Sequence, residues 1–355
     1  MRGTFANRKL VLILPLAVIG LAALAFVWSL RGVSNDPSPR RVLIEKGASA
    51  RQIAAILDDK GIIRSEFVFV TMCRIKGVGG KLKPGLYEFN RAMGASRIIK
   101  SLEDGDSLET WVTIPEGYTV RQIADLLDAK GLRRREAFLN ASLARSGRFD
   151  RCAFLYADSL EGYLFPDTYL IARDGDVDGA VTKMLDAFEE KVVSPLRPRL
   201  ERVILQRFGL ASASFAEGLH KMLTMASLVE REAKTDKDRP LIAAVLWNRL
   251  EKGMKLQVDA TITYVPGEST RNKDRVYHKD LADGSSYNTY RHYGLPPGPI
   301  CNPGNKAIEA VIAPAHSDCL YYVAEENGGH IFSRTYEQHQ AAIRRIKEAA
   351  RKGGK

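Results

Sequence analysis

An internal repeat occupies much of the first half of the chain. The sequence VLIEKGASARQIAAILDDKGIIRSEFV, which begins at Val42, matches VTIPEGYTVRQIADLLDAKGLRRREAF, which begins at Val112, at a constant offset of 70 residues. Each copy contains a short apolar run, a glycine, an amphipathic stretch with isoleucine and leucine at helical spacing, and a second glycine. The repeat therefore predicts two similar αβ units, each built from a strand, a turn and a helix.

The helix of each copy has recognisable ends. Ser49 and Thr119 stand at matching positions in front of the helical pattern, where a hydroxyl can accept a hydrogen bond from a free backbone N–H. Gly61 and Gly131 follow the pattern and are suited to end a helix. The whole pattern resembles that of LysM-like carbohydrate-binding modules. The alternative is a packing unit that was duplicated without any ligand.

The segment from Leu10 to Leu30 holds 21 residues without a charge, which is long enough to span a membrane as a helix. Three basic residues precede it, whereas only Arg31 follows closely. This excess of positive charge predicts that residues 1–9 are cytoplasmic and that the chain after Arg31 lies outside the cytoplasm. The alternative is a signal peptide cleaved near Ala23, although the apolar run continues past that point.

Composition narrows the choice of partner. The chain has 355 residues and a net charge of +11, which suits an anionic partner such as a lipid surface, an acidic polymer or nucleic acid. Nucleic acid is the weakest of these, because there is no aromatic-and-basic RNA motif and no recognition-helix signature. The four cysteines form no CxxC pair, so neither a metal site nor another cofactor is expected. Cys301 and Cys319 are either free thiols or a disulfide.

A pair of helices is predicted from Leu219 to Leu250, joined by a short polar turn. When the first helix is drawn at steps of about 100° per residue, Glu230 falls in the middle of an apolar stripe. Glu232 points about 200° away from it. An unpaired carboxyl group on an apolar face has a raised pKa, which is how a glutamate becomes a general acid near neutral pH. Glu230 is therefore the candidate catalytic acid.

The alternative for Glu230 is a structural ion pair with an arginine such as Arg249, because buried ion pairs also occupy such faces.

Three further stretches carry polar and aromatic side chains suited to a sugar polymer. They read LEGYLFPDTY from Leu160, MKLQVDATITY from Met254, and YNTYRHYGLPPGPI from Tyr287. The second of these is predicted to be a strand or an extended loop, with Gln257 and Asp259 on one side of it. The candidate substrate-binding residues are Glu161, Asp167, Gln257, Asp259, Tyr287, Asn288, Thr289 and Tyr290.

Several of these motifs together resemble the YceG-like family, the endolytic murein transglycosylases. The resemblance rests on ASLVERE at Ala226, the three stretches above, and GGHIFSRTYEQH at Gly328, all in the family's order. The first Glu of the family motif ASIVEKE aligns with Glu230. Departures are mild: Leu228 replaces Ile, Arg231 replaces Lys, and Tyr163 stands where Trp is common.

The resemblance implies an α+β protein in the inner (plasma) membrane, with a single transmembrane helix and an extracytoplasmic catalytic domain. It implies a linker at 31–41, a duplicated LysM-like region at 42–140 and a YceG-like catalytic domain at 141–355. The implied partners are peptidoglycan glycan strands, the membrane and a cell-wall synthase complex. The implied activity is cleavage of MurNAc–GlcNAc bonds in nascent strands, which limits strand elongation.

The mechanism implied by the resemblance needs one carboxyl group. Protonated Glu230 gives its proton to the glycosidic oxygen and then accepts one from the C6 hydroxyl, which closes a 1,6-anhydro ring. Gln257, Asn288 and Tyr290 are expected to hold N-acetyl groups or to steady the oxocarbenium ion. Two alternatives stay open. One is a hydrolytic muramidase with Asp259 or Asp167 as the second carboxylate, and the other is a scaffold protein that binds the wall without catalysis.

Overall fold

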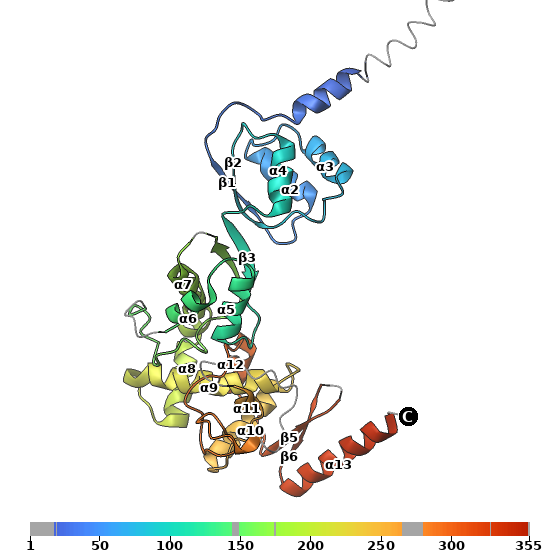
Figure 1. Ribbon diagram of the computed structural model, residues 1–355. Helices are drawn as coiled ribbons and strands as arrows, with labels where there is room; N and C mark the ends of the chain where they lie inside the picture. Colours follow the sequence, from blue (N-terminus) through green and yellow to red (C-terminus); the bar gives the residue numbers. More distant parts are fainter. Residues whose placement is uncertain are drawn as a thin grey trace, which may run out of the picture. The chain divides into compact units, whose positions relative to one another are not determined.

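The computed structural model describes residues 18, 20–143, 149–173, 175–264, 280–326 and 328–353. The chain forms two compact units (Figure 1). The first comprises the chain to Val112 together with Leu170–Asp174, and the second comprises Thr113–Tyr169 and Gly175–Lys355. Helices and antiparallel strands occur together in one chain, so the predicted α+β class is confirmed.

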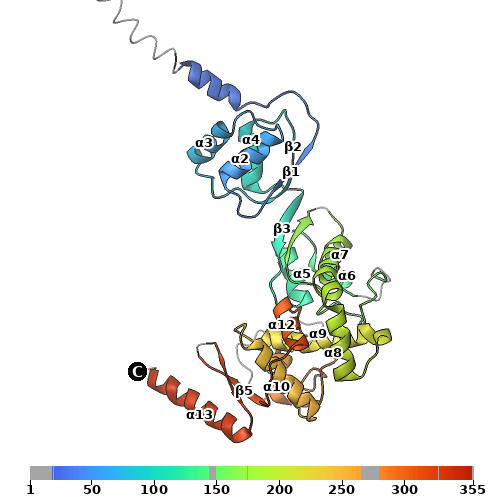
Figure 2. The same ribbon diagram turned by 180° about the vertical axis from the view of Figure 1, so that it is seen from behind.

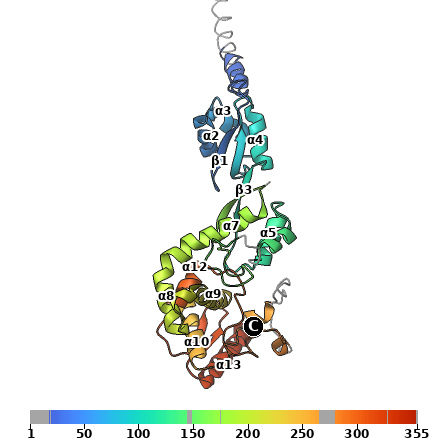
Figure 3. The same cartoon turned by 90° about the vertical axis from the view of Figure 1, so that its left-hand side faces the viewer.

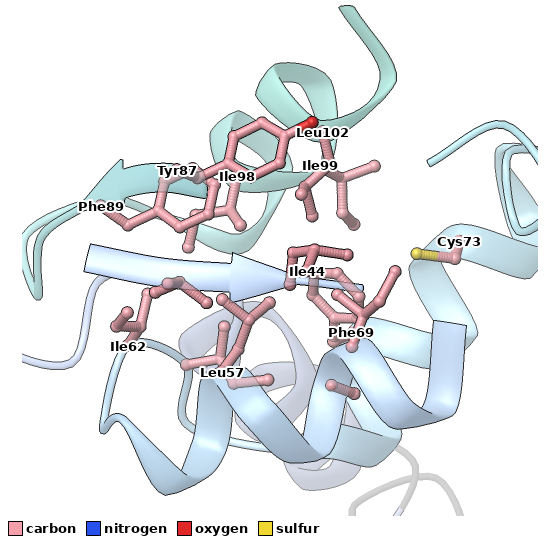
Figure 4. Close-up of a cluster of buried hydrophobic side chains, with 14 of the residues drawn as sticks. Ile44, Leu57, Ile62, Phe69, Cys73, Tyr87, Phe89, Ile98, Ile99 and Leu102 are labelled. Carbon is pink, nitrogen blue, oxygen red and sulfur yellow. The ribbon is translucent and has the colours of Figure 1, made fainter. Parts of the chain in front are cut away.

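The first unit contains the strands β1 (Arg40–Ile44) and β2 (Gly85–Phe89) and the helices α2 (Ala50–Asp59), α3 (Glu66–Ile75) and α4 (Ala95–Asp104). The two strands pair antiparallel, and their side chains alternate between a buried and an exposed face. Side chains of α2 and α4 gather around Ile44, Tyr87 and Phe89 in the core of this unit (Figure 4).

The second repeat copy supplies β3 (Glu109–Thr113) and α5 (Val120–Ala129), which is followed by α6 (Arg135–Ala141). Both repeat helices start as predicted: Ser49 and Thr119 each form a capping box with the glutamine three residues later. The sheet continues in the order β1-β2-β3-β4, with β4 at Thr168–Ala172. Apart from Val112, the second copy belongs to the second unit. The LysM-like character of residues 42–140 stays a prediction.

The second unit is mainly helical. Its long helix α9 (Phe215–Glu232) is buried along most of its length and packs against its helical neighbours (Figure 1, Figure 3). The other elements are α7 (Val177–Phe188), η2 (Glu189–Val193), α8 (Ser194–Phe208), η3 (Ser212–Ser214), α10 (Arg239–Glu251), α11 (Ala260–Thr263), η4 (Asp280–Ala282) and α12 (Asn305–Ile312). The strands β5 (Tyr321–Ala324) and β6 (His330–Ser333) form the predicted hairpin, and α13 (Tyr336–Gly353) follows it (Figure 2).

The structure decides between two pairs of alternatives that the sequence left open. The stretch from Met254 to Tyr264 forms no strand; it is a loop followed by the short helix α11. The reason is Gln257, whose φ of 54° is incompatible with extended backbone. Cys301 and Cys319 form no disulfide, because all four cysteines of the chain are free thiols.

The predicted membrane segment is only partly described. Residues 20–29 are helical, whereas residues 1–17 and 19, which include the predicted cytoplasmic end, lie outside the described residues. Within the described part of the chain, no helix combines the length and the apolar character needed to cross a membrane.

Candidate functional site

Helix α9 presents two glutamates near its end, and they occupy different surroundings. Glu230 has a side chain that is only 6% exposed, and its Oε1 accepts a hydrogen bond from Nη2 of Arg239 at 3.1 Å. Its Oε2 accepts a second bond from the backbone N–H of Gly304 at 3.0 Å. Glu230 is therefore an ion-paired carboxylate with both oxygens engaged. The expectation of an unpaired carboxyl group was wrong; the alternative of an ion pair with an arginine is confirmed, with Arg239 and not Arg249 as the partner.

A third carboxylate approaches the Glu230 ion pair from the loop before α5. Glu116 lies so close to Gly304 that a Cβ at that glycine would collide with its carboxyl group. Partial burial, and then the negative charge of Glu230, raise the pKa of Glu116. Arg239 offsets part of this repulsion. Two carboxyl groups, those of Glu116 and Glu230, therefore lie near the single guanidinium of Arg239, whose positive charge offsets part of their mutual repulsion.

Glu232 is partly buried, and its carboxyl group forms no ion pair with any residue that the structure describes. Its Oε2 accepts a hydrogen bond from the hydroxyl of Tyr322 at 3.1 Å. Burial, and then the negative charge of Asp259, raise the pKa of Glu232 to about 7. Hydrogen bonds from Tyr322 and from the backbone N–H of Ala260 favour the ionised form and oppose part of that rise. A carboxyl group with these properties can hold or release a proton near neutral pH.

Two predicted residues meet beside Glu232. The hydroxyl of Tyr290 donates a hydrogen bond to Oδ1 of Asp259 at 2.5 Å. Asp259 is exposed, and Tyr290 is half-buried. Burial and the Asp259 carboxylate raise the pKa of Tyr290, which therefore stays a hydroxyl donor at neutral pH. Glu232, Asp259, Tyr290 and Tyr322, called the Glu232 cluster below, thus join four separate parts of the chain.

Gln257 borders this cluster in a strained conformation. It is the only non-glycine residue with positive φ in the described parts of the chain. The guanidinium of Arg249 holds it there, because Nη1 donates to Gln257 Oε1 at 3.2 Å and to the carbonyl of Leu256 at 2.8 Å. The Gln257 N–H donates to the carbonyl of Thr289 at 3.2 Å. Strain of this kind persists only where the surroundings impose it, and it concentrates at functional sites.

Asn288 and Thr289 were predicted to bind substrate, but both side chains are buried and bonded within the protein. Asn288 donates through Nδ2 to the carbonyls of Leu281 and Asp283, and its Oδ1 accepts from the N–H of Tyr290. The Thr289 hydroxyl accepts from the N–H of Val258 at 2.9 Å. These residues therefore position Tyr290 and the loop that carries Gln257.

Glu161 and Tyr287 lie at a different place, in a cavity of about 420 Å³. Oε1 of Glu161 accepts hydrogen bonds from the Val120 N–H at 3.0 Å and from Asn302 Nδ2 at 3.1 Å. Burial raises the pKa of Glu161 to about 8. The Tyr287 ring packs on that of Tyr264, with centroids 5.0 Å apart. These two predicted residues are therefore brought together, but not with the Glu232 cluster.

Asp167 joins neither group. Its carboxylate forms an ion pair with Lys191 and accepts a hydrogen bond from the N–H of Thr168. A larger cavity, of about 580 Å³, lies along α8, α9 and α10 and contains none of the predicted site residues. Within the described residues, no group of His, Cys, Asp and Glu side chains is arranged to hold a metal ion.

The family assignment comes from comparison with known proteins. The model of the YceG-like family matches residues 42–345. This chain belongs to the YceG-like family.

Relatives of this YceG-like protein are known in several bacteria. The endolytic murein transglycosylase of Bacillus subtilis (strain 168) is 33% identical over 344 residues, which cover 92% of this chain and 90% of that protein. The endolytic murein transglycosylase of Streptococcus pneumoniae serotype 2 is 31% identical over 87% of this chain and 59% of that protein. A crystal structure of a putative YceG-like protein from Listeria monocytogenes superposes with a TM-score of 0.60 at 33% identity, covering 85% of this chain and 98% of that one.

Sequence reasoning missed two carboxyl groups around the site of this YceG-like protein, those of Glu232 and Glu116. Glu232 was set aside because it points away from the apolar stripe. Its hydrogen-bond partner Tyr322 belongs to the hairpin, and no local pattern links these two residues. Glu116 was not predicted, because the repeat pattern points to a strand, a turn and a helix and does not single out a carboxyl group in the turn. A comparison of the two copies offers one signal, since the residue at the matching position in the first copy is Lys46.

Proposed function

We propose that this chain is an endolytic murein transglycosylase. The proposal is supported by its membership of the YceG-like family and by the names of relatives that match it over most of its length. Murein is the peptidoglycan of the bacterial wall, so the substrate would be a glycan strand. The bond cut would be the one between N-acetylmuramic acid and N-acetylglucosamine.

Two carboxyl groups of α9 are candidates for the catalytic acid. Glu230 was predicted from the sequence, but its oxygens are already engaged by Arg239 and by Gly304. Glu232 has the pKa near neutrality that proton donation requires. The predicted residues Asp259 and Tyr290 accompany Glu232. The position of Glu232, which accepts a hydrogen bond from Tyr322 and lies beside the hydrogen-bonded Asp259–Tyr290 pair, is the observation that carries our choice of Glu232 as the acid, and burial there raises its pKa to about 7.

The reaction needs one proton carrier. Protonated Glu232 gives its proton to the glycosidic oxygen as the bond from that oxygen to C1 of the muramic acid breaks. The resulting carboxylate then takes the proton of the C6 hydroxyl while the C6 oxygen bonds to C1, which closes the 1,6-anhydro ring. The acid is regenerated, and no water is consumed. The negative charge of Asp259 would stabilise the oxocarbenium ion, and exposed Gln257 would bind a polar group of the sugar.

The alternative chemistry is hydrolysis with Asp259 as the base, since Asp259 is close enough to influence the pKa of Glu232. Mass spectrometry of the products separates the two reactions. Purified glycan strands are digested with the wild-type chain and with Glu232→Gln. Anhydro ends from the wild type alone support the proposal. Reducing ends would show a muramidase, and glycan binding without cleavage by either protein would show a scaffold.

We propose further that residues 10–30 anchor the chain in the inner membrane, with residues 1–9 cytoplasmic and the rest extracytoplasmic. The uncharged run supports this, as do the exposed apolar side chains of Val18, Leu21, Leu24 and Val27 in its described part. Alkaline carbonate extraction of membranes tests the anchor: the chain should stay in the pellet, and release would disprove it.

The remaining proposals concern the regions beyond the anchor. We propose a linker at 31–41, a LysM-like glycan-binding region at 42–140 and a catalytic domain at 141–355, together with contact to a cell-wall synthase complex. A sedimentation assay with purified murein tests the glycan-binding region. Substitutions confined to exposed positions of residues 42–140 should weaken binding by the full chain, and unchanged binding would favour a duplicated packing unit.

A further inference from the structure

Helix α3 of the first unit has an unusual exposed surface. Phe67 is 75% exposed and Ile75 is 72% exposed, which makes them the two most exposed large hydrophobic side chains in the described part of the chain. They lie eight residues apart, which puts them about 80° apart around the helix and about 12 Å apart along it, so both face the same half of its surface. The opposite side of α3 is buried in the core through Val68, Phe69 and Cys73. Two large apolar side chains exposed on the same half of a short helix make that half a candidate interaction surface.

The charges around α3 favour an anionic partner. Residues 64–76 carry Arg64, Arg74 and Lys76, and Glu66 is their only acid. Arg74 and Lys76 are both exposed at the end of α3 that carries Ile75. A short helix with aromatic and aliphatic side chains on one surface and cations at its ends suits the interface of an anionic bilayer, where the cations meet lipid phosphates.

The chain that leads from the proposed anchor is fastened to the start of α3. Arg64 donates hydrogen bonds to the carbonyls of Gly32 and Val33, at 2.7 and 2.8 Å, and its guanidinium lies 3.9 Å from the centroid of the Trp28 ring. The Ala95 N–H also donates to the carbonyl of Leu30 at 2.9 Å. Gly32 packs so tightly against Ala92 that it has no room for a side chain. Residues 28–33 are therefore a fixed attachment to the first unit.

This attachment limits how far α3 can be from the bilayer. Trp28 is 56% exposed at the end of the apolar helix, and tryptophan is enriched at the membrane–water interface. Phe67 follows Arg64 by three residues, which span at most about 11 Å. Each interfacial layer of a bilayer is roughly 5–8 Å thick. With Trp28 at the interface, the N-terminal end of α3 lies within or beside the lipid headgroups.

We propose that α3 docks on the outer surface of the membrane that holds the anchor, with Phe67 and Ile75 inserted among the lipid headgroups and upper acyl chains. The inference rests on the anchor proposed above. Docking of α3 would add a second contact between the first unit and the bilayer, besides the anchor. This second contact would restrict rotation of the first unit about the axis of the anchor helix. The occupant of the exposed surface of α3 is thus lipid, not a protein.

Depth-dependent quenching of a fluorophore tests this docking in the full chain, reconstituted in vesicles of phosphatidylethanolamine and phosphatidylglycerol. An environment-sensitive label is attached at Phe67→Cys or Ile75→Cys, with Cys319 replaced by Ser because it is the only cysteine that is not buried. The matched control is Glu88→Cys, because strand alternation puts Glu88 on the face of β2 opposite the helices. Lipids brominated on the upper acyl chain should quench the labels at 67 and 75 at least threefold more than the label at 88.

Equal quenching at the three positions would overturn the proposal. A label at 67 that is shielded both from brominated lipid and from aqueous iodide would also overturn it, since a protein would then cover α3. If a labelled chain misfolds by circular dichroism, Phe67→Trp and Glu88→Trp provide a second pair for the same comparison. Carbonate extraction separates the two proposals: release of the chain removes the anchor, whereas retention with equal quenching removes only the docking of α3.

Discussion

Glu230 and Glu232 are two residues apart on one helix, yet the surroundings of Glu230 favour the ionised carboxylate and those of Glu232 disfavour it. Glu230 meets a guanidinium and a backbone N–H, which satisfy a negative charge. Burial and the nearby Asp259 carboxylate disfavour the ionised form of Glu232, and the hydrogen bond from the Tyr322 hydroxyl offsets only part of this effect. Two positions of one helix thus place one carboxylate in an ion pair with Arg239 and the other beside Asp259 and Tyr322.

The two glutamates also link different secondary-structure elements. Glu230 ties the end of α9 to the start of α10 and to the residue before α12, which are neighbouring parts of the core. Glu232 joins α9 to the hairpin through Tyr322 and lies near exposed Asp259. Burial of a carboxyl group therefore does not by itself identify a catalytic acid. The partners of each oxygen, and the access of substrate to the groups nearby, decide between the two roles.

The largest effect is expected when each glutamate is replaced by its amide. Glu232→Gln should lower the rate of glycan cleavage about 10²–10⁴-fold, since general acid catalysis contributes that much. Glu230→Gln, the matched control on the same helix, should keep most of the activity of the folded protein. The rate of formation of anhydro ends measures both. The reverse order of effects would return the catalytic role to Glu230, as predicted from the sequence.

The second effect concerns stability. Arg239→Met should lower the free energy of unfolding by about 3 kcal/mol, because it leaves Glu230 as a buried charge without its ion-pair partner. The double variant Glu230→Gln/Arg239→Met should recover part of that loss, since no unpaired charge remains. Urea unfolding monitored by circular dichroism gives both values. No recovery in the double variant would show that Arg239 acts mainly through its other ion pair, with Asp236.

The third effect is a shift in pH dependence. The folded-state pKa of Glu232, at about 7, is above its unfolded value, so the active protonated form is lost as pH rises through 7. Tyr322→Phe removes a hydrogen bond that favours the carboxylate, so the alkaline limb of the activity profile should move up by about one pH unit. Tyr321→Phe changes the neighbouring strand residue and should leave the limb in place. A downward shift in Tyr322→Phe would contradict the assignment of Glu232.

The elements of the fold could largely be predicted because their signals are local. Hydroxyl caps at Ser49 and Thr119, and the strands of the hairpin, depend on residues a few positions apart. The partner of Glu230 could not be chosen this way. Arg239 and Arg249 both lie on α10, but Arg249 is about 15 Å further along the helix. Only the path of the turn between α9 and α10 decides which of them is close.

The site was harder to predict for the same reason. Gln257, Asp259 and Tyr290 were predicted to bind substrate, and the structure places Asp259 and Tyr290 beside Glu232, which the sequence did not single out. The pKa of Glu232 depends on Tyr322, which approaches from 90 residues further along the chain. A helical wheel records the direction of a side chain and cannot record what covers it. Asn288 and Thr289 show the converse. Their residue types suit sugar binding, but both side chains are buried and hydrogen-bonded within the protein.

The smallest effect on stability is expected at the strained residue beside the Glu232 cluster. Gln257→Gly removes the cost of a side chain at positive φ, about 1 kcal/mol, but it also loses the hydrogen bond from Arg249. The two changes nearly cancel, so the free energy of unfolding should change by less than about 1 kcal/mol. Cleavage should nevertheless fall about tenfold through a higher KM, because the exposed amide is absent. Gln257→Asn is the control: asparagine tolerates this φ and keeps an amide, so it should restore part of the binding. Wild-type kinetics in Gln257→Gly would show that the strain holds only the loop and that the Gln257 side chain does not contact the glycan.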